Sequence, residues 1–191
     1  MRNLLGRTAV AVALVAAPAT LLAQGATPRH EFGIDLGLGF HSYSSPGVGS
    51  TTSFEAMTPV DVRMGFVSAS PLSVEGRLVF DFNSRGIGAN ASYLLAPDVN
   101  LLYKLGRGST WRRGAYLTGG LGLALANASN GAGGTRSGII ASLNGGIGTR
   151  IPSGSAAWRL EGFLAYAFRN TSLGEPGTLT IGGRVGLSLW H

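Results

Sequence analysis

The stretch EFGIDLGLGF, residues 31–40, alternates strictly between two kinds of residue. Its even-numbered positions are large and apolar, from Phe32 to Phe40, whereas its odd-numbered positions are Glu, Asp or Gly. Successive side chains of a β-strand point to opposite faces. This period of two therefore predicts a strand with one apolar and one polar face.

The same alternation recurs along the chain and predicts eight strands in total. The seven further stretches are 60–66, 72–82, 99–105, 116–125, 139–151, 158–168 and 181–190. Between them we expect long loops rich in Gly, Ser, Asn and Thr at 42–56, 83–90, 127–136 and 169–177. Short turns are expected at 68–71 and 152–156, with Pro71, Pro152 and Gly154 as turn formers, and an intermediate connection at 106–114. Residues 86–98 fit either a longer fourth strand or a loop.

The composition excludes several classes of protein. The chain has 191 residues, 31 of them Gly, no Cys and only 13% charged residues, against about 25% charged and about 7% Gly in soluble domains. Its 45% hydrophobic content is too high for a disordered chain, and the absence of Cys rules out a disulfide scaffold. After residue 23 the sequence has no run of 18 apolar residues, so no transmembrane helix is expected.

The first 23 residues have the pattern of a secretory signal peptide. Arg2 and Arg7 precede a short apolar run at 8–17, Pro18 interrupts it, and Leu21-Leu22-Ala23 resembles a cleavage site. A membrane anchor is the alternative, but a spanning helix needs about 20 apolar residues. We therefore expect a signal peptide at 1–23 and one barrel domain at 24–191. The remaining 13 basic and 9 acidic residues are too balanced and scattered to indicate nucleic acid binding.

Alternation alone does not say which face is inside. A soluble lipocalin-like barrel or sandwich turns its apolar face inward, whereas an outer-membrane barrel turns it outward. The aromatic residues favour the membrane barrel, because they fall near the strand ends, as expected for two girdles at the bilayer–water interfaces. The predicted girdle residues are Phe32, Phe66, Tyr103 and Trp158 at one end, and Phe40, Phe80, Phe82, Tyr166 and Phe168 at the other. Trp190 falls on the inward face.

The polar face carries a balanced set of charges. Its predicted members are Glu31, Asp35, Asp61, Glu75, Asp81 and Glu161, with Arg63, Arg77, Lys104, Arg150, Arg159 and Arg184. An enclosed interior requires such balance, because an unpaired buried charge costs several kcal/mol. We expect a structural salt-bridge network with same-strand pairs Asp61–Arg63, Glu75–Arg77 and Arg159–Glu161, and inward glycines that make room for the arginines. An ion-conducting path and acid–base catalysis are the alternatives.

The pattern over residues 31–191 resembles the small eight-stranded outer-membrane barrels, namely the OmpA transmembrane domain and the OmpX-like family. The apolar final strand is similar to their C-terminal assembly signal, although it ends in Trp190-His191 and not in Phe. The resemblance implies an all-β up-and-down transmembrane barrel with periplasmic termini, short periplasmic turns and longer outward loops. It also implies a monomer in outer-membrane lipid and lipopolysaccharide, assembled by the barrel-assembly machinery with periplasmic chaperones.

Candidate chemical sites are few. His30, His41 and His191 lack metal-ligand spacing. The glycine-rich stretches 119–122 and 145–148 lie inside strands with no helix to follow, unlike phosphate-binding loops. His41 with Ser42 and Ser44 is the one weak candidate for a lipid-modifying site. We therefore expect no cofactor, no metal and no enzyme activity, but a structural envelope or surface-interaction role through the outward loops. A narrow ion or solute channel is the main alternative.

Overall fold

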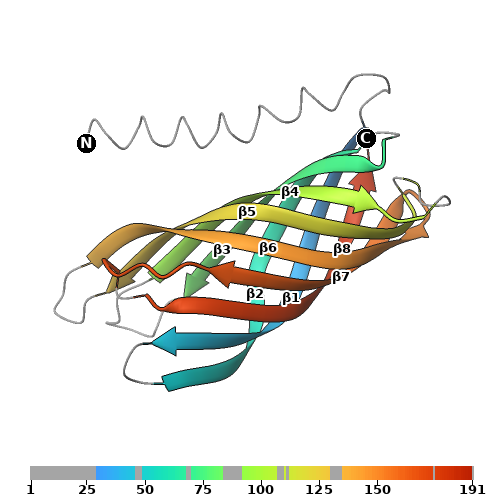
Figure 1. Ribbon diagram of the computed structural model, residues 1–191. Helices are drawn as coiled ribbons and strands as arrows, with labels where there is room; N and C mark the ends of the chain where they lie inside the picture. The colour runs from blue at the N-terminus through green and yellow to red at the C-terminus, as the bar shows by residue number, and fades with distance from the viewer. Residues whose placement is uncertain are drawn as a thin grey trace.

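The protein is described by a computed structural model at residues 29–45, 49–67, 70–83, 92–106, 110, 112–129, 135–173 and 175–190. Its strands are β1 (Arg29–Ser45), β2 (Gly49–Val67), β3 (Leu72–Asn83), β4 (Ser92–Lys104), β5 (Gly114–Ser129), β6 (Thr135–Ser153), β7 (Ala156–Ala167) and β8 (Gly177–Trp190). They form a closed barrel in which each strand pairs antiparallel with its sequence neighbours and β8 pairs with β1 (Figure 1). The predicted eight-stranded antiparallel barrel is confirmed. No helix in the described part of the chain is long and apolar enough to cross a membrane.

The two ends of the barrel differ. The start of β1 and the end of β8 lie together, where Glu31 pairs with Trp190. Connections 68–71, 105–113 and 154–155 belong to the same end, and we call it the terminal end. The opposite end, toward which β1–β2 and β5–β6 extend in Figure 1, is called the hairpin end.

The strands are longer at the hairpin end than the sequence pattern predicted. The expected loop at 42–56 is wrong, because β1 continues to Ser45 and pairs with Gly49 at the start of β2. The expected loop at 127–136 is shortened in the same way, with Ser129 paired to Thr135. Polar residues such as Thr are good strand formers. Where neither face of a strand meets an apolar layer, however, the sequence does not alternate between apolar and polar residues, and the prediction depended on that alternation.

Two prolines interrupt the ladders inside the strands. The β1–β2 register shifts between Asp35, which pairs with Asp61, and Gly37, which pairs with Met57; Pro59 lies in this irregular segment. β4 begins at Ser92, so residues 92–98 belong to the longer fourth strand, with Pro97 within it, whereas residues 86–91 lie outside the described part. Proline has no N–H to donate to a ladder, which explains why both positions coincide with gaps in pairing. Pro152 also lies in a strand, so the β6–β7 turn is formed by residues 154–155, with Gly154 at a φ of 61°.

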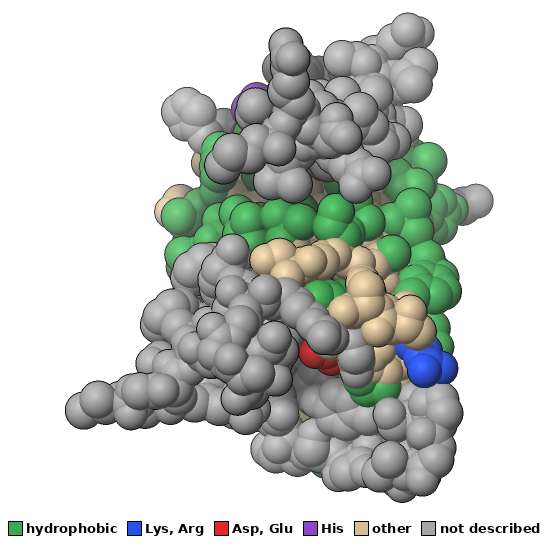
Figure 2. Space-filling model, turned by 90° about the vertical axis from the view of Figure 1, so that its left-hand side faces the viewer, with side chains coloured by type: hydrophobic (Ala, Val, Ile, Leu, Met, Phe, Trp, Pro, Cys, Tyr) green, Lys and Arg blue, Asp and Glu red, His purple; other side chains and the backbone are tan. Residues whose placement is uncertain are grey.

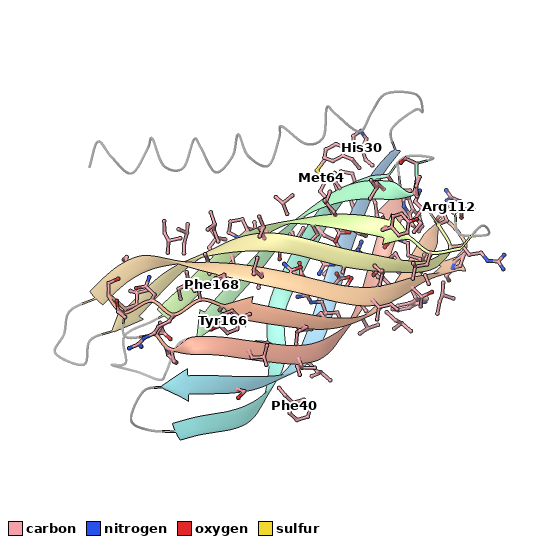
Figure 3. The ribbon with its side chains drawn as sticks, in the orientation of Figure 1. His30, Phe40, Met64, Arg112, Tyr166 and Phe168 are labelled. Carbon is pink, nitrogen blue, oxygen red and sulfur yellow. The ribbon has the colours of Figure 1, made fainter. Side chains whose placement is uncertain are left out.

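The two faces of the barrel are the reverse of those of a soluble protein. The exposed large apolar side chains project from the outer wall, from Ile34 and Leu36 on β1 to Leu121 on β5, which is 65% exposed. Figure 2 shows such side chains as a broad green zone on the face it presents, and Figure 3 shows Phe40 pointing away from the barrel. The buried side chains are mostly charged or polar. The protein therefore has a polar core inside an apolar wall.

Candidate functional site

The candidate site is the charged interior, and Arg63 of β2 is one of its centres. The Arg63 guanidinium donates to Glu31 Oε1 at 2.6 Å and to Asp35 Oδ2 at 2.9 Å. It also donates to Ser188 Oγ on β8 at 2.7 Å. Gly33 on β1 provides the space, since a Cβ there would lie 2.3 Å from the Arg63 Cζ. Three strands thus hold one arginine with two carboxylates.

A second centre is a ring of alternating charges from β3 and β7. Arg77 donates to Glu75 Oε1 at 2.7 Å and to Glu161 Oε2 at 2.9 Å. Arg159 donates to Glu161 Oε2 at 2.7 Å and also to Glu75 Oε2. β3 and β7 are not neighbours in the barrel, so these four side chains span its interior. Arg159 and Glu75 are each 1% exposed.

Tyr116 of β5 joins the two centres and was not among the predicted site residues. Its ring centroid lies 4.8 Å from the guanidinium carbons of both Arg150 and Arg159. Its hydroxyl donates to Glu161 Oε2 at 2.9 Å and accepts from Arg159 Nε. A Cβ at Gly148 would lie 2.2 Å from that hydroxyl, so glycine is required beside it. Its position on the polar face of β5 could have predicted an interior role, but tyrosine is equally typical of the aromatic girdles at the membrane interfaces.

The remaining predicted cations lie at the edges of these centres. Arg150 donates to Glu31 Oε2 at 2.8 Å. Lys104 donates to the Ser70 carbonyl oxygen at 2.7 Å, near the terminal end. Arg184 lies over the Phe163 ring at 4.0 Å and donates to Glu161 Oε1 at 3.3 Å.

One same-strand pair of the predicted network needs correction. The same-strand pairs Glu75–Arg77 and Arg159–Glu161 are present, but Asp61 and Arg63 do not form the third. Arg63 binds the carboxylates of β1 instead, and Asp61 lies 3.9 Å from the guanidinium nitrogens of Arg77 and Arg184. The reason is geometric: Asp35 is paired directly opposite Asp61 across the β1–β2 ladder and competes for the same cation.

Asp98 is an interior carboxylate that the sequence pattern missed. It pairs with Arg77 across the β3–β4 ladder, accepts a hydrogen bond from Asn100, and packs against Gly122. Extending the alternation of β4 back through Pro97 would have found it. The side chain of Asp81, the sixth predicted carboxylate, lies outside the described part. Among described residues the interior therefore balances six carboxylates with five arginines and Lys104.

The interior is closed to solvent toward the terminal end, where Glu31 and Ser188 lie. Glu31 and Ser188 are fully buried, at 0% exposure, whereas Ser142 and Asn144, which lie on β6 nearer the hairpin end, are partly exposed. Four of the six described carboxylates, those of Glu31, Asp35, Glu75 and Glu161, accept hydrogen bonds from guanidiniums. No group of three or more His, Asp or Glu in the described residues could hold a metal ion.

The predicted aromatic residues lie on the outer wall where their side chains are described. Phe32, Tyr103 and Trp158 are exposed near the terminal end, and Phe66 is half-buried with its ring 5.3 Å from that of His30. Toward the hairpin end the exposed rings are Phe40, Tyr166 and Phe168 (Figure 3), and the last two are in edge contact at 5.3 Å. The side chains of Phe80, Phe82, His41 and Ser44 lie outside the described part, as do His191 and the predicted signal peptide.

The sequence matches no protein-family profile and no curated protein. Among solved structures, the barrel is similar to that of Neisserial surface protein A, with a TM-score of 0.55 and 14% identity over 87% of this chain and 99% of that one. It is also similar to Ail, the attachment invasion locus protein of Yersinia pestis, with a TM-score of 0.49 and 13% identity over 83% of this chain and 98% of that one. At 14% identity, the likeness to Neisserial surface protein A shows the fold alone.

Proposed function

We propose that the protein is an integral outer-membrane barrel that serves the envelope or surface interaction and not catalysis. The observation that carries this proposal is the inverted distribution of side chains. Large apolar residues cover the wall, and Arg63, Arg159 and Glu75 form the core. In water a continuous apolar wall of this kind promotes aggregation, whereas in a bilayer it is the favourable surface.

The closed ladder supports the same proposal. Hydrocarbon offers no partner for backbone N–H and C=O groups, so a spanning sheet must satisfy them internally. Each strand here pairs on both sides within the wall. The exposed rings of Tyr103 and Trp158 at one end, and of Tyr166 at the other, suit the two bilayer–water interfaces. We place the terminal end in the periplasm, as the family resemblance implies.

The interior supports a structural role over a channel. The ring crosses the barrel through hydrogen bonds of 2.7 Å from Arg77 to Glu75, 2.9 Å from Arg77 to Glu161 and 2.7 Å from Arg159 to Glu161. An eight-stranded barrel has room for little more than its own side chains. We therefore propose that the charges rigidify the barrel and seal it.

The hairpin end is the proposed interaction surface. β1 and β2 continue beyond Pro59 as an extension of the barrel, paired from Gly37–Met57 to Ser45–Gly49, and the other edge of β1 stays paired with β8 as far as Ser44–Gly177. The β2–β3 pairing ends at Val60–Phe80, so within the described residues this part of β2 pairs only with β1. An unpaired strand edge offers N–H and C=O groups to an added strand. This geometry supports contact with other molecules through the extension.

Heat-modifiable migration tests the proposed membrane barrel. The folded protein should sediment with the outer-membrane fraction and run faster in SDS gels before boiling than after it, because the closed barrel resists SDS. A variant with residues 46–53 deleted, at the tip of the extension, should keep the shift and lose surface binding. Recovery in the soluble fraction with no boiling-dependent shift would contradict the proposal.

A further inference from the structure

Two interior carboxylates, those of Asp61 and Asp98, accept no hydrogen bond from a guanidinium within the described part of the chain. Their strands, β2 and β4, both run from the hairpin end toward the terminal end. Asp61 therefore lies on the hairpin side of Arg63. Asp98 lies on the hairpin side of Asn100, which is the ladder partner of Glu75. We call Asp61 and Asp98 the acidic edge of the charged interior.

The acidic edge contains buried oxygen atoms that lack a hydrogen-bond donor among the described residues. Asp61 is 5% exposed, and neither of its carboxylate oxygens has a hydrogen-bond partner. Guanidinium nitrogens of Arg77 and Arg184 lie 3.9 Å from its Oδ2, beyond hydrogen-bond distance. Asn100 is 1% exposed, and its Oδ1 also lacks a partner, whereas its Nδ2 donates to Asp98. Buried polar atoms are normally paired, so these acceptors point to a donor from outside the chain.

Gly122 of β5 brings a hydroxyl group close to the acidic edge. It is paired with Asp98 of β4 on one side and with Ser142 of β6 on the other. A Cβ at Gly122 would lie 2.6 Å from the Ser142 Oγ and 3.2 Å from the Asp98 Cβ. The Ser142 hydroxyl and Asp98 therefore approach each other over this glycine. Both residues are partly exposed, so a small molecule can reach them.

The inner face next to these polar groups is apolar. Toward the hairpin end, the alternation of faces places Ala96, Ala124 and Ile140 on the inner side of β4, β5 and β6. Each of the three is partly exposed, and none has a side chain that can form a hydrogen bond. A molecule bound at the acidic edge would thus meet acceptors at one end and apolar side chains along its length.

We infer that the acidic edge binds organic cations that carry a primary ammonium group on a short alkyl chain. An ammonium group has three N–H donors and a positive charge, which match the unpaired oxygens of Asp61 and Asn100 and the carboxylate of Asp98. A metal ion fits less well, because no group of three or more His, Asp or Glu among the described residues could hold one. The inference goes beyond the proposed structural role and requires only the closed barrel.

The reactivity of a cysteine at position 142 tests the inference. The chain has no cysteine, so Ser142→Cys places a single thiol beside Asp98. The full barrel is refolded in zwitterionic micelles and treated with methanethiosulfonates that carry a primary ammonium, a trimethylammonium or a sulfonate group. Each rate is divided by the rate with free cysteine. The primary ammonium reagent should react about tenfold faster than the sulfonate reagent, and also faster than the trimethylammonium reagent, which has no N–H donor.

Competition and two matched variants identify the groups responsible. In Ser142→Cys protein, n-butylammonium chloride should slow the reaction, whereas uncharged n-butanol should not. Adding Asp98→Asn removes one charge and keeps the shape of the side chain, and it should lower the rate of the primary ammonium reagent about tenfold. Adding Glu175→Gln instead removes a carboxylate from the β7–β8 connection at the same end, and it should leave the rate unchanged.

Equal normalised rates for the three reagents would overturn the inference, as would an equal loss of rate in Glu175→Gln. Absence of competition by n-butylammonium would also overturn it, because water alone would then serve the unpaired oxygens. A thiol that reacts with none of the reagents would place the acidic edge out of reach of any ligand. If Asp98→Asn does not fold, the n-butylammonium competition decides the outcome. Heat-modifiable migration shows in each case whether the barrel is folded, so a folded barrel without reagent preference contradicts only this inference, whereas a chain that never shows the shift contradicts the proposed function.

Discussion

Replacing Arg159 by Met is expected to lower the free energy of unfolding by about 3–5 kcal/mol, because it leaves an uncompensated buried charge. Arg159 is 1% exposed and binds Glu75, Glu161 and the Tyr116 hydroxyl. Met fills much of the same volume but donates no hydrogen bond. Urea unfolding of the protein from phosphatidylcholine vesicles, followed by tryptophan fluorescence, measures the change.

Two matched variants separate lost charge balance from lost packing. Adding Glu75→Gln to Arg159→Met restores neutrality and should recover about half of the loss, because one of the freed carboxylates no longer carries charge. Arg169→Met removes an exposed arginine at the hairpin end and should change stability by less than about 0.5 kcal/mol. A loss below about 1 kcal/mol for Arg159→Met would show that the buried network does not stabilise the barrel.

Replacing Gly182 by Ala is expected to destabilise the barrel by about 3 kcal/mol, the upper range for overpacking. A Cβ at Gly182 on the inner wall would lie 2.3 Å from the Leu38 carbonyl oxygen and 2.7 Å from the Phe163 ring. The carbonyl belongs to the β1 backbone and cannot move without disturbing the β8–β1 ladder. The same vesicle-based unfolding experiment measures the effect.

Gly162→Ala is the matched control on the outer wall. A Cβ there would have its nearest neighbour, the Ile147 carbonyl oxygen, at 4.0 Å. Both changes gain the same entropic advantage of Ala over Gly in a strand, so the difference between them isolates packing. Equal effects at Gly182 and Gly162 would mean that the close approach of β8 to β1 is not a constraint.

The number of strands, their faces and most of the interior charges could be predicted from the sequence. Alternation is a local property, and residues 31–40 display it over ten successive positions. The lengths of β1 and β2 could not be predicted in this way, because their outer parts face no apolar layer and lose the pattern. The partners of Arg63 depended on register: Asp35 and Asp61 compete across one ladder, and only the pairing shows that Asp35 binds it.

Contacts across the barrel could not be predicted either, because they depend on which strands face each other and in what register. Glu75 and Arg159 lie 84 residues apart in the sequence and on strands that are not neighbours. Tyr116 likewise receives its role from Arg150 and Arg159 on other strands. Asp98 was hidden by the proline before it, which interrupts the ladder but not the alternation of faces.

The depth of Leu121 tests the central claim, that the apolar wall lies in lipid, most directly. The chain has no cysteine, so a single Leu121→Cys replacement can carry an environment-sensitive fluorophore at one defined site. Leu121 is 65% exposed on the outer wall of β5, and the exposed Arg113, in the β4–β5 connection at the terminal end, provides the comparison site. In folded protein in phosphatidylcholine bilayers, we expect blue-shifted emission at position 121, quenched most by nitroxides deep in the acyl chains, and headgroup-depth quenching at position 113. Water-like emission at position 121 without quenching by deep nitroxides would contradict a membrane-embedded wall.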